Sequence, residues 1–585
     1  DGKMFTDFIK PEFTYEYSET TIDHNTKTVT VIFDVADKYF STSGLTTDTT
    51  ASKIALSVGG KTPTNATKKL SKVSDLTATI NGKANTKVGE RYKLVVTNLD
   101  QNDGNNYSGV MTMSFAADLI KDKSGNGNLA KTITIGIDDP TTGDGDDNSQ
   151  IVDVVSPLWK VENVKIDNTN KKVTADLIAT DKYLTGAANS TLTTNNITVA
   201  VDGDTNANTA ITKALSTAAY STNSTTGLKE IKYTLTLSNF EQASKQSGKS
   251  FLEYSGTTKI TIAAGVVTDQ YTNKSREQSF TLGHVDFIKP RVEKVSSSIN
   301  ASAKTETIRF NVIDKYLDTT KLLTADNIRV FVDGEEATNI TKSLTRISAN
   351  DASATVNGTA QTISQQYQLV LSNFEKTRNA KNYKDWSGTV TIQVATNVVK
   401  DKVITSGSNT SGGNTSDATT LKGNFADFIK PDLKYVHQSA DINKDGKTYT
   451  MTFTVTDKYY RTGKLTLNDL VVKMQNGQKD SSGNEIIYNL KDEPVTMSLQ
   501  DTELKASNVP ITNTSGSVQT VASLVIGHTY KLTISNLEQL ERKAGLTTAD
   551  YSGIITVAVA GNKVLDRGPA GDNANSNGNV ATTIT

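Results

Sequence analysis

The chain has 585 residues, with 62 Lys and Arg against 63 Asp and Glu and a formal net charge of −1. This balance argues against a nucleic-acid scaffold, because the protein would release few counterions from a phosphate backbone. There is no Cys, and the four His residues lie far apart, which excludes disulfides, thiolate metal sites and a zinc motif built on two closely spaced His.

The motif Asp-Phe-Ile-Lys-Pro recurs along the chain. It begins at Asp7, Asp286 and Asp427, and a degenerate copy begins at Asp153. The copies are about 140 residues apart, much longer than the roughly 20–50 residues of a solenoid unit, so each is predicted to be a complete domain. The predicted organisation is four domains at 1–139, 151–285, 286–424 and 425–585, with an acidic Gly/Asp linker at 140–150.

Inside each copy, the pattern of apolar and polar residues repeats every two residues. Apolar residues alternate with mostly polar ones over 28–35, 92–96 and 449–455, which predicts half-buried strands rich in Thr, Val, Ile and Tyr. The dipeptides Asp202-Gly203, Asp333-Gly334 and Asn476-Gly477 predict hairpin turns. About seven short strands in each copy indicate an antiparallel sandwich.

Three further landmarks follow in the same order in every copy. They are Asp-Lys-Tyr, then Tyr-x-Leu-x-x-x-Asn, then an aromatic residue followed by Ser-Gly. Asp-Lys-Tyr begins at Asp37, Asp181, Asp314 and Asp457, the second landmark at Tyr92, Tyr233, Tyr367 and Tyr530, and the third at Tyr107, Tyr254, Trp386 and Tyr551.

The sequence of one turn, together with the start of the domain that follows it, resembles a known class of repeats. The turn is Ile120-Lys-Asp-Lys-Ser-Gly-Asn126 in the first copy and begins with Val399-Lys-Asp401 in the third; a Thr-rich strand and an Asp-x-x-x-Pro opening follow. This pattern resembles the bacterial Ig-like tandem repeats of large cell-surface adhesins and other surface proteins, whose domains close with Val-x-Asp-x-x-Gly-Asn. The turn departs from that pattern at 269–273, where it is eroded, and at 406–417 and 568–579, where it is expanded. The resemblance implies an all-β fold of four tandem Ig-like antiparallel β-sandwich domains in an elongated array.

The same resemblance implies a non-enzymatic stalk segment of a bacterial cell-surface or secreted protein that spaces or displays an adhesive region. A surface-layer or filament subunit is the alternative, and direct binding of a glycan or host protein by one domain is a third. No nucleophile elbow or phosphate-binding loop occurs, and no run reaches the roughly 18 apolar residues of a membrane helix. The expected partners are neighbouring repeats and a host or matrix ligand or lattice neighbours, without nucleic acid or membrane insertion. We also expect the parent protein to extend beyond both ends.

Three Asp residues recur at equivalent positions of each copy and form the candidate site. Antiparallel topology predicts that they meet at the N-terminal pole of each domain, where several carboxylates could bind Ca²⁺ at a domain junction. The alternative is that each Asp only caps a turn through its own backbone. No other cofactor is expected. The triads are Asp7, Asp37 and Asp122; Asp153, Asp181 and Asp269; Asp286, Asp314 and Asp401; and Asp427, Asp457 and Asp566.

Five further features each have a structural interpretation. The segment 441–446 resembles the start of an EF-hand loop but lacks the Glu at the twelfth position, so a hairpin turn is expected. Lys38 and Asn98 are the residue types of an isopeptide bond, but they are predicted to lie at opposite poles, with Asn98 serving a turn. The two Trp are expected to pack rather than stack on sugars. The acidic linker is a solvated hinge or an ion-ordered joint, and 406–418 is predicted to be a loop.

Overall fold

The computed structural model describes most of the chain. The acidic linker at 140–150 lies outside the described residues. These are 6–23, 25–41, 45, 52–99, 107–135, 152–241, 254–356, 358–375, 386–436, 442–461, 463–513, 515, 517–537, 553–566 and 582–584.

The protein is all-β, as the sequence predicts, and the strands of each sheet pair antiparallel throughout the described residues. The helices of the described segments are single turns. They are α2 (Ala207–Ala210) and the 3₁₀ turns η1 (Ala187–Asn189), η2 (Thr194–Asn196), η3 (Ala325–Asn327), η4 (Ser348–Asn350), η5 (Leu467–Asp469) and η6 (Leu490–Asp492).

The described residues fall into two compact units. The first unit comprises residues within 1–246, 253–287 and 405–411, and the second comprises residues within 288–404 and 412–585. The first therefore holds repeats 1 and 2 with two short segments of repeat 3 (286–287 and 405–411), and the second holds the remainder of repeat 3 with repeat 4.

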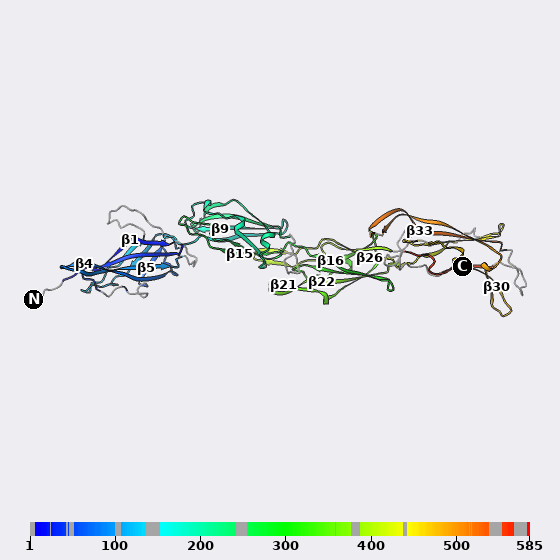
Figure 1. The fold of residues 1–585 in the computed structure, drawn as a ribbon, viewed down its shortest axis with the longest axis horizontal. Coiled ribbons are helices and arrows are strands. Elements are labelled where there is room, and N and C mark those ends of the chain that lie inside the picture. The colour runs from blue at the N-terminus through cyan, green and yellow to red at the C-terminus, as the bar shows by residue number, and fades with distance from the viewer. Residues whose placement is uncertain are drawn as a thin grey trace. The chain divides into compact units, whose positions relative to one another are not determined.

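Repeat 1 has two sheets, and β1, β4 and β5 of the larger one are labelled in Figure 1. The stacking of Phe13 on Phe115, with ring centroids 4.1 Å apart, joins the two sheets across the core. The sheets are β1 (Glu12–Asp23), β2 (Thr28–Ala36), β5 (Lys83–Thr97) and β4 (Thr67–Ile80) in that order, and β3 (Ile54–Val58), β6 (Met111–Phe115) and β7 (Lys131–Ile135).

Repeat 2 has the same plan. One sheet has the order β11-β13-β9-β8, with β12 on β13, and the other has the order β10-β14-β15. The bounds are β8 (Leu158–Asp167), β9 (Lys172–Asp181), β10 (Ile197–Val201), β11 (Thr212–Leu215), β12 (Ala219–Thr222), β13 (Lys229–Ser238), β14 (Gly256–Ile262) and β15 (Gln278–Val285).

Repeat 3 adds short strands to this plan. Its sheets are β16-β17-β22-β20, with β21 on β22, and β19-β18-β23-β26; β24 and β25 form a separate hairpin. The bounds are β16 (Arg291–Asn300), β17 (Thr305–Ile313), β18 (Ile328–Val332), β19 (Glu335–Glu336), β20 (Thr341–Arg346), β21 (Ala352–Val356), β22 (Thr359–Ser372), β23 (Gly388–Val394), β24 (Val403–Ser406), β25 (Asn409–Gly412) and β26 (Thr419–Ala426).

Repeat 4 has the longest strands. Its sheets are β27-β29-β33-β32, with β28 on β29, and β31-β30-β34-β35. The bounds are β27 (Asp432–Val436), β28 (Ile442–Asn443), β29 (Thr448–Thr456), β30 (Leu470–Lys479), β31 (Glu485–Asn489), β32 (Thr496–Thr512), β33 (Val518–Ser535), β34 (Ile554–Val559) and β35 (Thr582–Ile584).

Each repeat buries a main hydrophobic cluster between its sheets, because the alternating strands turn their apolar side chains inward. A stacked aromatic pair recurs in three of the cores, formed by Phe33 with Tyr92, by Phe310 with Tyr367 and by Phe453 with Tyr530. The Tyr in each pair comes from the Tyr-x-Leu-x-x-x-Asn landmark, which is thus a core strand that ends in a turn.

Two local predictions were wrong. The hairpin expected at Asn476-Gly477 lies further along, because β30 runs through this dipeptide with a register irregularity and the chain turns at 480–484. The loop expected at 406–418 contains β25 and part of β24. In both cases strand pairing continues through residues that favour turns locally.

Candidate metal centres

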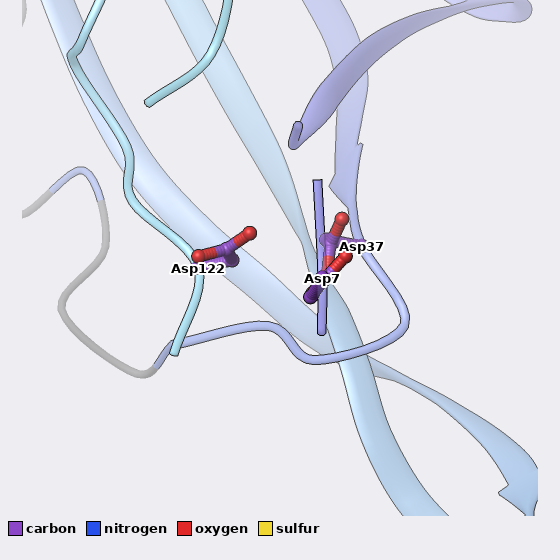
Figure 2. A group of neighbouring side chains, drawn as sticks. All are labelled: Asp7, Asp37 and Asp122. Atoms are coloured by element: carbon purple, nitrogen blue, oxygen red, sulfur yellow. The ribbon is translucent and has the colours of Figure 1, made fainter. Parts of the chain in front are cut away.

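The structure brings the predicted Asp triads together. In repeats 1, 2 and 4, one carboxylate oxygen from each of the three Asp residues lies within 4.8 Å of the other two. Figure 2 shows the group in repeat 1, where Asp7 and Asp37 lie together and Asp122 comes from a neighbouring loop. In repeat 3 the unit boundary follows Phe287, so Asp286 belongs to the first unit; Asp314 and Asp401 lie within the same distance of each other in the second.

Antiparallel topology explains the convergence. Asp7 precedes β1, Asp37 follows the returning strand β2, and Asp122 lies in the turn after β6. These three positions lie at the same end of the sandwich. Because β1 and β2 run in opposite directions, the start of β1 and the end of β2 are at the same end. The predicted pole is therefore correct for this triad.

Turn capping and clustering occur in the same residues. The Oδ1 atom of the central Asp accepts a hydrogen bond from the backbone N–H two residues later, which is an Asx turn. The donor is the Tyr of the Asp-Lys-Tyr motif, and the distance is 2.7 Å for Tyr39 to Asp37, Tyr183 to Asp181 and Tyr459 to Asp457. Capping uses one oxygen and leaves the second for the cluster, so the two interpretations do not exclude each other.

The second carboxylate oxygens of Asp7 and Asp37 lie in a buried and unfavourable environment. These Oδ2 atoms are buried and have no hydrogen-bond partner among the described residues. Asp37 as a whole is only 6% exposed. Burial raises the pKa of Asp37, and the nearby charges of Asp7 and Asp122 raise it further. Packing three carboxylates here is unfavourable unless a proton or a cation offsets their repulsion.

The triad of repeat 2 is buried more deeply. Burial raises the pKa of Asp153 to about 8, and the charges of Asp181 and Asp269 add to this effect. Burial also raises the pKa of Asp269. At neutral pH this group without a cation would retain a proton that an isolated Asp would have lost.

In repeats 1 and 2, an Asn that the sequence interpretation did not single out as a site residue orients the third Asp of the triad. In repeat 1 the Asn126 Nδ2 donates to Asp122 Oδ2 at 2.7 Å and to the backbone oxygen of Asp7 at 3.0 Å. In repeat 2 the Asn273 Nδ2 donates to Asp269 Oδ2 at 2.8 Å and to the oxygen of Asp153 at 3.0 Å. The available signal was the Asn four residues after the Asp in both turns.

The donor set fits a hard cation. The ligands on offer are carboxylate oxygens, without nitrogen or sulfur. Two oxygens bound to one Ca²⁺ at about 2.3–2.6 Å can be up to about 5 Å apart, so the 4.8 Å limit suits a shared ion. Three carboxylates fill part of a six- to eight-oxygen shell, which backbone carbonyls and water would complete.

The Lys side chain of the Asp-Lys-Tyr motif forms a hydrogen bond with the preceding repeat. In the first unit Lys182 Nζ donates to the backbone oxygen of Ser108 at 2.9 Å, and in the second Lys458 Nζ donates to that of Ser387 at 2.8 Å. Both carbonyls belong to the aromatic-Ser-Gly landmark, so these two motifs are the two sides of one joint.

The joint in the second unit also contains a buried ion pair. Lys458 Nζ lies 2.6 Å from Asp333 Oδ2, and both side chains are completely buried. The same carboxylate accepts hydrogen bonds from Tyr459 Oη and Thr512 Oγ1, both at 2.5 Å. A Cβ at Gly388 would lie 2.1 Å from Asp333 Oδ2, which explains why the landmark ends in Gly.

The other candidates are structural. Asn98 has a left-handed backbone (φ 63°), and its Nδ2 donates to Thr67 Oγ1 at 3.0 Å, so it serves a turn as expected. The EF-hand-like segment leads through a tight turn between β28 and β29; Asp441 lies outside the described residues. Trp159 and Trp386 are buried in the cores of repeats 2 and 3.

No protein-family model matches the chain, and no curated protein matches it. Among solved structures, Salmonella alpha-2-macroglobulin reacted with methylamine is similar at 8% identity with a TM-score of 0.14, over 99% of this chain and 40% of that chain. A TM-score this low carries no argument about fold or function. Within the described segments, no helix is long and apolar enough to cross a membrane.

Proposed function

We propose that the chain is a non-enzymatic spacer segment of a bacterial cell-surface protein, in which Ca²⁺ bound by the Asp triads stiffens the junctions between repeats. The supporting observation is the position of the triads. In the first unit Lys27 of repeat 1 donates to Asn273 Oδ1, beside the triad of repeat 2, at 2.7 Å. In the second unit Ser387 Oγ of repeat 3 donates to Asp427 Oδ1 at 2.8 Å. A cation bound at such a position would stabilise the junction between the two repeats as well as the domain that contains the triad.

Thermal unfolding tests the role of Ca²⁺. The chain should melt at a higher temperature in Ca²⁺ than in EDTA, because an ion that binds only the folded state stabilises it. Asp181→Asn should reduce that difference, since it removes one carboxylate from the triad of repeat 2.

Asp167→Asn is the matched control. Asp167 caps a turn in the same repeat by accepting from Asn170 N at 2.9 Å, but it belongs to no triad. It should leave the Ca²⁺-dependent difference in melting temperature intact. Equal effects of the two substitutions would mean that the Asp residues act as turn caps alone.

Small-angle scattering tests the spacer role separately. A spacer should be an extended monomer in dilute solution, and its flexibility should fall when Ca²⁺ replaces EDTA. A compact particle would contradict the spacer proposal. Ordered sheets on addition of Ca²⁺ would instead favour the surface-layer alternative.

A further inference from the structure

Side chains join the first and last strands of repeat 3. These strands, β16 and β26, are edge strands of the two different sheets of the repeat. Lys294 Nζ on β16 donates to the backbone oxygen of Lys422 on β26 at 2.6 Å, and Ser297 Oγ donates to Asn424 Oδ1 at 3.0 Å. These bonds connect the two sheets along one side of the sandwich.

A third contact lies just before the two strands begin. Lys289 Nζ is 2.7 Å from Asp417 Oδ1, and both side chains are exposed, so salt weakens this ion pair. The three contacts advance together along both strands, which means that β16 and β26 run parallel. We call these three contacts the edge clamp.

A buried acid holds β26 at the edge clamp. The pairing of β26 with β23 is irregular between Lys422 and Phe425, and Asn424 lies in this irregularity. The Asn424 N–H donates to Oε1 of the buried Glu306 on β17 at 2.5 Å. Gly423 leaves room for this carboxyl group, since a Cβ there would lie 2.4 Å from Oε1. Asn424 is therefore held by β17 as well as by β16.

Repeat 2 has different residues at these positions. Counted from the opening Asp of each repeat, Lys294 and Ser297 correspond to Val161 and Val164. Both Val side chains pack on the core of repeat 2 and have no polar atom to donate. The two hydrogen bonds of the edge clamp therefore come from substitutions that distinguish repeat 3 from repeat 2.

The direction of the two strands determines how tension acts on them. The chain enters repeat 3 before β16 and leaves it after β26. Because the strands run parallel, tension on the chain pulls them in opposite directions along their lengths. The contacts between them are then loaded together rather than one after another. The rate of unfolding under force depends on the barrier that such contacts raise.

We propose that repeat 3 is a load-bearing module, in which the edge clamp between β16 and β26 resists tension along the chain. A spacer needs only to separate two parts of a protein, so this function goes beyond the proposed one. It does not depend on bound Ca²⁺, because the contacts of the edge clamp involve no Asp of a triad.

Pulling single molecules of the full chain by both ends at constant force in EDTA tests this role. An insertion of about 20 Gly and Ser residues after the exposed Gly358 marks one unfolding step, because it lengthens only the chain that repeat 3 releases and exposed turns tolerate insertions. Lys294→Val with Ser297→Val gives the edge clamp the residues of repeat 2. The marked step should become about tenfold faster, which corresponds to about 1.4 kcal/mol in the barrier.

Arg329→Met is the matched control. It removes the ion pair of Arg329 with Glu336, which joins the antiparallel strands β18 and β19 of the same repeat, and it should leave the marked step unchanged. Unfolding in urea separates load bearing from general stability, and there the Val variant should accelerate much less than under force. An unchanged marked step, an equal effect of Arg329→Met, or equal acceleration in urea and under force would overturn the proposal.

Discussion

Asp333 connects two repeats through one carboxylate. It lies in a tight turn after β18 with φ of 49°, and its side chain accepts from Lys458, Tyr459 and Thr512. A buried charge is tolerated only when it is paired and hydrogen-bonded, and here both conditions are met. The pair therefore fixes which residues meet at this joint.

Asp333→Asn should destabilise the second unit by about 3–5 kcal/mol, because Lys458 would remain charged and buried without its partner. Asn tolerates the left-handed backbone, so the turn itself is preserved. Adding Lys458→Met should recover part of the loss, which urea unfolding of the two variants would measure. Equal stability of the single and double variants would contradict the ion-pair interpretation.

Glu306 is a second buried acid in the same unit. It is fully buried, its Oε1 accepts from Asn424 N at 2.5 Å, and burial raises its pKa to about 8 although Lys294 opposes the shift. Between the unfolded pKa of about 4.5 and the folded value, the unfolded chain loses the proton first. This group therefore lowers the stability of the fold as the pH rises from about 5 to 8.

Glu306→Gln should remove that slope, because the amide oxygen can still accept from Asn424 and carries no proton to lose. At pH 8 the variant should be more stable than the parent by a few kcal/mol, at about 1.4 kcal/mol for each unit of pKa shift. Urea unfolding at pH 5 and pH 8 measures the difference. An unchanged pH dependence in the variant would show that Glu306 is not the group responsible.

At the scale of elements, a short segment of the expanded turn packs on repeat 2 within the first unit. Residues 405–411 belong to the first unit. There Asn409 accepts from Ile166 N and donates to the oxygen of Val164, and Ser411 Oγ donates to the oxygen of His284 at 2.7 Å. Residues 405–411 of the expanded turn therefore contact β8 and β15 of repeat 2.

Asn409→Ala should destabilise the first unit by about 1–3 kcal/mol, because two backbone groups of β8 lose their partner. Hydrogen exchange at the Ile166 amide should accelerate. Ser408→Ala, an exposed change at the hairpin tip, is the control and should have no effect. Unaltered exchange in Asn409→Ala would mean that the hairpin contact does not persist in solution.

The sequence predicts what is local and periodic. Alternation over 28–35 locates β2, and the order of the Asp landmarks in an antiparallel frame predicts the triads. It does not predict the pairing of Asp333 with Lys458, since these residues are far apart in the sequence and meet only when two repeats dock. Strand pairing also overrides the turn preference of Asn476-Gly477, because β30 gains partners in β31 and β34.

At the scale of the whole molecule, each unit joins its repeats by the same three contacts: an apolar side chain, Val154 or Phe428, that packs on the preceding repeat, a Lys that reaches a Ser carbonyl, and an Asp triad at the joint. A fold divided into small sandwiches has modest cores, so the joints contribute much to the rigidity of each unit. Cations that neutralise the triads would add to that rigidity, which is the central claim of the proposed function.

Calorimetric titration of the EDTA-treated chain with Ca²⁺ tests this claim most directly. The prediction is saturable binding of at least three ions per chain, matching the triads of repeats 1, 2 and 4, with one fewer after Asp181→Asn and no change after Asp167→Asn. A chain that binds no Ca²⁺, or whose stoichiometry is unchanged by Asp181→Asn, would contradict the account.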